Sequence, residues 1–183
     1  HPVQQEELLL FDGDSLVKVF GPRWRLLLIG AGELTRRVAQ LGLTLDYAVT
    51  ICDSRPEYAA SWLVEGTEFL SSSTAETVRD FHPDPQTVVL ALSHTPALDD
   101  AALTAALNSE ACYIGALGSE ANQRARCKRL QKQGVQARQL QRLQGPVGLD
   151  IGSRTPAEIA VAIMAALIQQ RNNKMPLSRD AGY

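Results

Sequence analysis

The chain has 183 residues, of which 45% are hydrophobic and 21% charged, a composition typical of a soluble globular domain. This composition excludes a disordered tail, a collagen-like fibre and a disulfide-stapled miniprotein, and the length suits one domain with a full core. Eighteen Lys and Arg against twenty Asp and Glu give a formal net charge of -2, and only 5% of the residues are aromatic. Both features argue against a nucleic-acid-binding domain.

The apolar runs are short, and none approaches the ~20 residues that a membrane helix needs. Residues 1–7 carry neither a basic segment nor a small-residue cleavage site, so no signal peptide and a cytoplasmic location are expected. The three cysteines form no Cys-x-x-Cys pair, and we expect Cys52 and Cys112 to be buried thiols. No metal site is predicted.

The elements alternate along most of the chain. Residues 1–22 are expected to form a lead-in segment or linker, and residues 172–183 a polar tail. In chain order, the predicted strands are 26–29, 47–52, 67–70, 87–92 and 112–117. The predicted helices are 34–41, 74–81, 99–107, 119–133 and one that begins at Pro156, within the capping box of residues 155–158.

This alternation predicts the fold class. Nearly continuous apolar strands separated by helical segments are typical of βαβ units in a parallel sheet that is covered on both faces. Right-handed crossovers then give a doubly wound sheet, and the strand order 3-2-1-4-5 is the one considered for it. We therefore predict an α/β fold over residues 23–171, a three-layer Rossmann-like domain whose sheet is mostly parallel.

The first predicted strand runs directly into Gly30-Ala31-Gly32, here called the Gly turn, and a helix follows. In a dinucleotide-binding loop the first glycine permits the tight turn and the second lets the backbone approach a pyrophosphate at the helix N-terminus. Thr35 stands where the third glycine of that motif would be. Asp53 ends the second strand about 20 residues after Gly32, where an acid binds ribose hydroxyls.

Several ligands fit this pattern. Arg55, two residues after Asp53, is placed to receive a 2′-phosphate instead, so both NAD and NADP remain open. S-adenosylmethionine sites use a similar Gly turn and strand-end acid. In the alternative interpretation the glycines and the acid serve only turn and cap geometry.

Further candidates follow the fourth and fifth strands. In a doubly wound sheet, Ser93 and His94 should face the Gly turn across the crevice at the carboxyl ends of the strands, as should Gly118 and Ser119. His94 is a candidate phosphate contact or acid–base group. A local hydrogen-bonding role is the alternative.

The segment 145–154 is rich in glycine and leads into the capped helix. Its amides could form a second anion site, to which Arg154 would add charge. A loop bent for packing is the alternative.

Residues 121–145, here called the basic stretch, hold seven Lys and Arg and no acid. Such a run indicates a solvated helix face or a docking surface for an acidic partner or an anionic cofactor.

Five segments recur in the order of a known family: IGAGEL at 29–34, CDSRP at 52–56, SH at 93–94, YIGALGS at 113–119 and GPVGLDIGSRTPAEIA at 145–160. Together, over roughly residues 24–171, they resemble the C-terminal Rossmann domain of the XdhC/CoxI family. Members of that family are accessory factors of xanthine dehydrogenase and related molybdenum hydroxylases.

The resemblance implies a chaperone rather than a catalyst. It would bind molybdenum cofactor of the molybdopterin type and deliver it to an apo molybdenum hydroxylase, with a cysteine desulfurase and a second copy of the chain as further partners. The residues that would hold the ligand or close the crevice are Gly30, Ala31, Gly32, Glu33, Asp53, Ser93, His94, Gly118, Ser119, Gly148, Asp150, Gly152 and Arg154. An NAD(P)-dependent oxidoreductase using the same turn is the alternative function, although no Tyr-x-x-x-Lys pairing is present.

The sequence also departs from the family pattern. Glu33 stands where many members have His, and Glu120 and Ala121 stand where many have two arginines. The family's usual N-terminal module, with its Gly-Gly-Cys segment, is not in this sequence. If that module holds part of the site, this chain alone is expected to bind molybdopterin weakly.

Overall fold

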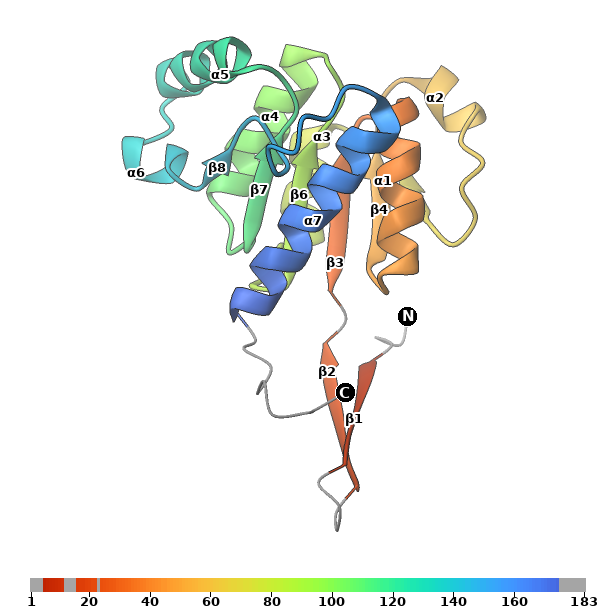
Figure 1. Cartoon of the computed structure of the whole chain (residues 1–183). Helices are drawn as coiled ribbons and strands as arrows, with labels where there is room; N and C mark the ends of the chain where they lie inside the picture. Colours follow the sequence, from red (N-terminus) through yellow and green to blue (C-terminus); the bar gives the residue numbers. More distant parts are fainter. Residues whose placement is uncertain (1–4, 12–15, 23, 175–183) are drawn as a thin grey trace.

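The structure, a computed structural model, describes residues 5–11, 16–22 and 24–174 (Figure 1). Within these residues the chain forms a six-stranded parallel sheet of order β5-β4-β3-β6-β7-β8 and a separate two-stranded sheet. The six strands are β3 (Arg25–Ile29), β4 (Ala48–Cys52), β5 (Glu68–Leu70), β6 (Thr87–Ala91), β7 (Tyr113–Ala116) and β8 (Leu143–Gln144). The predicted α/β fold is confirmed, and β8 extends the predicted strand order by one.

The helices cover both faces of the sheet. They are α1 (Glu33–Thr44), α2 (Pro56–Ala60), α3 (Thr74–Phe81), α4 (Pro96–Leu107), α5 (Glu120–Lys132), α6 (Ala137–Leu140) and α7 (Pro156–Lys174). Helices α1 and α7 pack together in one hydrophobic cluster, whereas α3 and α4 pack together in the other. None of the helices in the described part of the chain is long and apolar enough to cross a membrane.

The alternation of side chains along β3 explains the three layers. Leu26 and Leu28 belong to the cluster with α1 and α7, while Leu27 and Ile29 belong to the cluster with α3 and α4. All four are fully buried, and burying each such side chain stabilises the fold by roughly 1.5–3 kcal/mol. A strand buried on both faces has to be apolar throughout, which is why this run of the sequence shows no alternation.

Several features go beyond the sequence prediction. The segment expected as a lead-in contains an antiparallel hairpin of β1 (Gln5–Phe11) and β2 (Leu16–Pro22), drawn apart from the larger sheet in Figure 1. Helices α2 and α6 and strand β8 have two to five residues, too few to show a period. Helix α7 continues to Lys174, while residues 175–183 of the predicted tail lie outside the described part of the chain.

Candidate functional site

The carboxyl ends of β3 and β6 lie side by side, because Ile29 pairs with Ala91 in the parallel register. Strand β3 leads into α1 on one face and β6 leads into α4 on the other, so the winding of the sheet reverses between them. Ligands of doubly wound folds bind at this reversal. The Gly turn follows β3 and the Ser-His turn (residues 93–94) follows β6, so both predicted segments lie there.

Gly30 brings the two turns into direct contact. Its N–H donates to the Cys52 carbonyl at 2.8 Å, and its φ of 93° is one that L side chains rarely adopt. A Cβ at this position would overlap with the backbone and Cβ of Ser93. Only glycine therefore allows the Gly turn to pack against the Ser-His turn.

Gly32, in contrast, borders open space. It is the N-cap residue of α1, and among the described residues no side chain caps this helix. A Cβ built on Gly32 would meet no atom within 4 Å. Glu33, in the first turn, is paired with Arg37 at 2.8 Å on the helix surface. The first amides of α1, which have no intrahelical acceptors, therefore face a region that a ligand can enter.

Asp53 is fully buried and its carboxylate accepts four hydrogen bonds. Oδ2 accepts from the Ala31 N–H at 2.9 Å and from Arg55 Nη2 at 2.7 Å. Oδ1 accepts from the Arg55 N–H at 3.1 Å and from Arg55 Nε at 2.9 Å. Burial by itself would raise the pKa of Asp53, but these hydrogen bonds outweigh it and hold the pKa below its usual value. Asp53 is therefore ionised, and it fixes the Gly turn to the end of β4.

These contacts fill the roughly four lone-pair positions of a carboxylate. The spacing of Asp53 predicts contacts to ribose hydroxyls. In this structure its carboxylate oxygens instead accept hydrogen bonds from Ala31 and Arg55. The Arg55 side chain is 28% exposed and lies with its Cζ 4.0 Å from the centroid of the Tyr58 ring. Arg55 is thus partly exposed beside Asp53, with the exposed Glu57 two residues further on.

The Ser-His turn is hydrogen-bonded to Asp99 in the first turn of α4. Ser93 donates to Asp99 Oδ1 through its hydroxyl at 2.6 Å and its N–H at 3.2 Å. Burial raises the pKa of Asp99, and the hydrogen bonds from Ser93 offset this only in part. His94, by contrast, is exposed and has a φ of 61°, the left-handed conformation that is uncommon outside glycine. Ser93 therefore acts structurally in this arrangement, while His94 is exposed to solvent.

Ser119 caps α5, since its hydroxyl accepts the Asn122 N–H at 3.2 Å. Beneath this cap lies Arg126, which is only 6% exposed and donates through Nη2 to the Leu117 carbonyl at 2.7 Å. Burial lowers its pKa, against the opposing effects of Asp99 and Asp100. The sequence prediction missed this residue, although Leu130 one turn later is also buried and marks the inward face.

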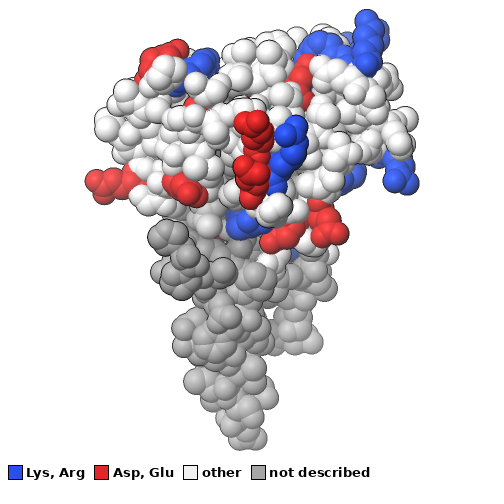
Figure 2. Space-filling model, turned by 180° about the vertical axis from the view of Figure 1, so that it is seen from behind, with Lys and Arg blue, Asp and Glu red and all other residues white. Residues whose placement is uncertain are grey.

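The basic stretch is therefore partly structural. Arg129 binds Asp100 of α4 through Nε at 2.6 Å, and Arg142 donates to the carbonyls of Leu107, Ser109 and Ala111. The exposed members are Arg124, Lys128, Lys132, Arg138 and Arg142, the last of which also binds the three carbonyls. Figure 2 shows the molecule from behind, with Lys and Arg gathered at one upper corner. The solvated-face interpretation fits only these exposed members.

The glycine-rich segment before α7 is packed and capped. Gly148 has a φ of 103°, and a Cβ there would lie 3.1 Å from the α7 backbone at Ala162. The amides of Arg154 and Thr155 donate to Glu158 Oε2 at 2.7 and 2.9 Å, which completes the predicted capping box. These bonds lower the pKa of Glu158. The anion position predicted here is taken by the chain's own carboxylate, and Asp150, Gly152 and Arg154 are exposed around it.

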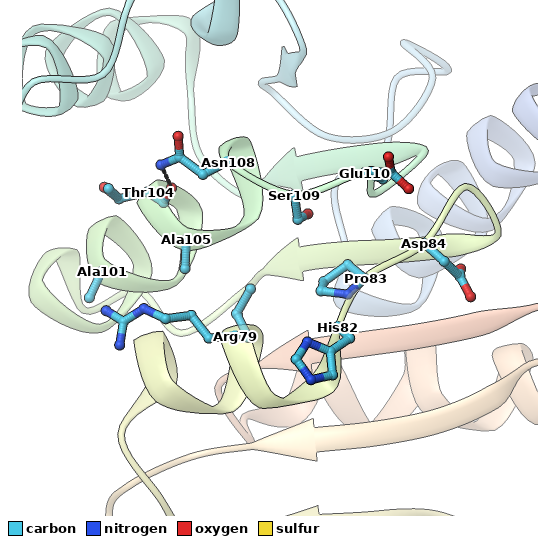
Figure 3. A pocket seen from close by; sticks show the side chains of 11 residues that line it. Arg79, His82, Pro83, Asp84, Ala101, Thr104, Ala105, Asn108, Ser109 and Glu110 are labelled. Atoms are coloured by element: carbon cyan, nitrogen blue, oxygen red, sulfur yellow. Dashed lines mark hydrogen bonds between the residues drawn. The ribbon is translucent and has the colours of Figure 1, made fainter.

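A groove of about 690 Å³ lies between α3 and α4, at the amino ends of β6 and β7 (Figure 3). Its floor is apolar and its rim carries both signs of charge. The lining residues are Val78, Arg79, His82, Pro83, Asp84, Ala101, Thr104, Ala105, Asn108, Ser109 and Glu110. None of the predicted site residues lines this groove. The groove lies at the amino ends of the strands, whereas the Gly turn lies at their carboxyl ends. Among the described residues, no three His, Cys, Asp or Glu side chains group to hold a metal ion.

The parallel sheet, with the Gly turn at its winding reversal, defines a Rossmann-type domain. The chain belongs to the XdhC family, whose Rossmann domain matches residues 26–167. This confirms the resemblance found in the sequence.

Three known proteins are similar to this chain over most of its length. It is 31% identical over 161 residues to the uncharacterized protein YqeB of Escherichia coli, and 31% identical over 151 residues to a probable xanthine dehydrogenase subunit of Bacillus subtilis. A crystal structure described as a xanthine dehydrogenase from Bacillus halodurans superimposes with a TM-score of 0.75 at 27% identity, over 92% of this chain. The chain spans 29%, 44% and 50% of these relatives, respectively.

Proposed function

We propose that this domain belongs to an accessory factor associated with a xanthine dehydrogenase, and that it binds the phosphate-bearing end of molybdenum cofactor at the Gly turn. Family membership and the xanthine dehydrogenase names of two relatives support the association. The cofactor would be held for delivery to an apo molybdenum hydroxylase. The cysteine desulfurase and the second copy of the chain remain predictions of the same hypothesis.

The observation that carries this proposal is the open space at Gly32. A Cβ built on Gly32 would meet no atom within 4 Å, and the α1 amides beside it have no side-chain cap among the described residues. Amides and the positive end of a helix dipole suit a phosphate group. The described residues offer no comparable set of thiolates, imidazoles and carboxylates for a metal, so we assign the phosphate end of the cofactor to this domain.

The residues of the chain would bind and orient the ligand. The Gly turn, fixed by Asp53, receives the phosphate, and the Ser-His turn, fixed by Asp99, borders the same crevice. In this proposal the exposed His94 would donate a hydrogen bond to the ligand from the Ser-His turn. The molybdenum centre supplies the redox chemistry once it is bound in the hydroxylase, so this domain needs no catalytic group of its own.

A Gly32→Val variant tests the proposal. The φ of -79° at position 32 suits any residue, and the space around a Cβ there is open. The variant should therefore fold, with a free energy of unfolding about 1 kcal/mol lower because valine is a poor N-cap. The valine would fill the region that the phosphate enters, and we expect at least a hundredfold loss of affinity. Titration with molybdenum cofactor released from a hydroxylase measures this, with melting temperature as the check on folding.

Ala125→Val on the exposed face of α5 is the matched control and should bind like the unmodified chain. Equal binding by Gly32→Val would contradict the assignment of the ligand to the Gly turn. Reduction of NAD or NADP with a small alcohol or acid as substrate would instead favour the oxidoreductase alternative.

A further inference from the structure

We infer that the loop before α7 (residues 145–155) and the outer side of α5 form a docking surface, and that it binds an acidic surface of the apo molybdenum hydroxylase that receives the cofactor. The inference rests on the proposed function and adds the place where the recipient binds. The centre of this surface, here called the apolar patch, consists of Leu149, Ile151 and Val161. Its flank, here called the basic stripe, consists of Arg124, Lys128 and Lys132.

The apolar patch gathers most of the large apolar side chains that the described residues expose. Four such side chains are exposed, and three of them belong to the patch, with Ile151 55% and Val161 52% exposed. The Leu149 N–H donates to the Ala162 carbonyl at 3.1 Å, which places the loop beside the exposed side of α7. Apolar side chains gathered in this way are typical of surfaces that bind another protein.

The loop that carries the patch is fixed from both sides. Gly148 lies against the α7 backbone, which a Cβ would approach within 3.1 Å, and Glu158 accepts the two amides at the end of the loop. Between them, a Cβ on Gly152 would meet no atom within 4 Å. Ile151 is therefore held in solvent by a loop of fixed shape, and such a surface loses little conformational entropy when a partner binds.

The patch lies at the end of the sheet that carries the Gly turn. The N–H groups of Leu92, Leu117 and Val147 donate to the last residue of the neighbouring strand, at 2.9, 3.0 and 3.0 Å. The segments after β6, β7 and β8 therefore begin side by side at the carboxyl ends of the strands, and Figure 1 shows the loop before α7 crossing this end of the sheet. A protein that takes the cofactor from the Gly turn has to approach the same end, where the patch is exposed.

The basic stripe supplies the charge that selects the partner. Arg124, Lys128 and Lys132 stand at positions i, i+4 and i+8 of α5, so that one side of the helix presents three cations in a row. Among the described residues, only Arg124 of these three has a carboxylate within 4 Å, that of Glu120 at 3.6 Å. Like charges at this spacing destabilise a helix. Carboxylates on a partner would relieve the repulsion.

The two parts of the surface adjoin at Gly145. The Gln123 side chain of α5 packs directly onto the Gly145 backbone, where a Cβ would overlap with it. Gly145 begins the loop that carries the patch, and Gln123 precedes the first residue of the stripe. An apolar centre with a polar rim is the usual composition of a protein interface, and charges on the rim mainly speed association and select the partner.

The charge of the surface favours a different protein over a second copy of this chain. In a symmetric dimer built on the patch, the same face would meet itself. The two basic stripes would then be brought together, and like charges across an interface oppose association. An acidic recipient meets no such repulsion, and the predicted dimer of this chain would use another face.

The test measures binding of the chain to apo xanthine dehydrogenase from the same organism, produced in a strain that makes no molybdenum cofactor. Ile151→Glu places a carboxylate at the centre of the patch, and we expect affinity to fall by about tenfold or more. Val161→Glu, on the α7 side of the patch, should have the same effect. Leu63→Glu is the matched control, because this exposed leucine lies between α2 and β5 at the opposite edge of the sheet, and it should bind like the unmodified chain.

The double variant Lys128→Glu/Lys132→Glu tests the flank. Affinity of the unmodified chain should fall as salt is raised, mainly through slower association. The double variant should bind more weakly at low salt and depend less on salt. Arg79→Glu, which changes an exposed arginine of α3, is the matched control and should keep the salt dependence of the unmodified chain.

Titration with molybdenum cofactor separates this inference from the proposed function. Ile151→Glu should bind the cofactor like the unmodified chain and keep its melting temperature. Unchanged affinity of Ile151→Glu for the apo enzyme, or no binding by the unmodified chain, would overturn the docking surface, while cofactor binding would still report on the Gly turn. A loss of cofactor affinity in Ile151→Glu would assign the patch to the ligand instead. Self-association of the unmodified chain that Ile151→Glu abolishes, measured by sedimentation, would assign it to a second copy, and either result would overturn the inference.

Discussion

The two glycine-rich segments that precede α1 and α7 differ in what occupies the helix N-terminus. Before α7, the Glu158 carboxylate accepts the amides of Arg154 and Thr155. Before α1, Glu33 turns away to Arg37, and the space at Gly32 is open. The same type of segment is thus filled by the chain's own carboxylate at α7 and left open at α1.

The largest expected effect concerns the packing of the first segment. Gly30→Ala would force a Cβ into Ser93 at a φ of 93°, so we expect a loss of about 3 kcal/mol or more, or failure to fold. Chemical denaturation of the variant against Gly32→Ala, which should change stability by less than about 1 kcal/mol, measures the contrast. Similar stability of the two variants would show that the Gly turn is not packed against the Ser-His turn.

A second variant would make the two segments alike. Gly32→Asp places a carboxylate at the N-cap of α1, where it can accept the free amides as Glu158 does at α7. We expect phosphate-ligand affinity to fall at least a hundredfold, while melting temperature is unchanged or slightly higher. The comparison with Gly32→Asn, which caps without the charge, separates repulsion from occupancy. Retained affinity in both would place the ligand elsewhere.

The smallest effect is expected at α7. The hydrogen bonds to Glu158 lower its pKa, so its contribution to stability is fully present above the pKa of an unfolded Glu and is lost as pH falls through the lower folded value. Glu158→Gln should therefore be less stable than the unmodified chain near neutral pH, with the gap closing in acid. Thermal unfolding across that range measures the gap. Glu76→Gln, in the first turn of α3, is the control, and a gap independent of pH would contradict the capping role.

The sequence predicted the fold better than the side-chain contacts. An unbroken apolar run such as residues 26–29 requires burial on both faces, and the connection rules then favour a doubly wound parallel sheet. The spacing of Asp53 placed it correctly at the end of β4, but spacing does not show which side chain a carboxylate accepts from. The bidentate contact from Arg55, two residues away, became visible only in three dimensions.

The charge pattern of the sequence was likewise an incomplete guide to which basic side chains are exposed. A run of basic residues without acids predicts a solvated face, yet Arg126 is buried beneath the loop that follows β7. The charges of Asp99 and Asp100 on α4, distant in sequence, partly offset the effect of this burial, and a local charge count cannot include them. Short elements such as β8 were missed because two residues carry no period.

The contact between Gly30 and Ser93 has a consequence for how the domain holds together. Ser93 is anchored to Asp99 of α4, and the neighbouring Asp100 is anchored to Arg129 of α5. The two halves of the sheet, β3 to β5 and β6 to β8, are thus in direct contact at their carboxyl ends, where the backbone of the Gly turn packs against that of the Ser-His turn. A ligand bound at the Gly turn would therefore lie on a surface formed by both halves of the sheet. A movement of either turn would displace the other.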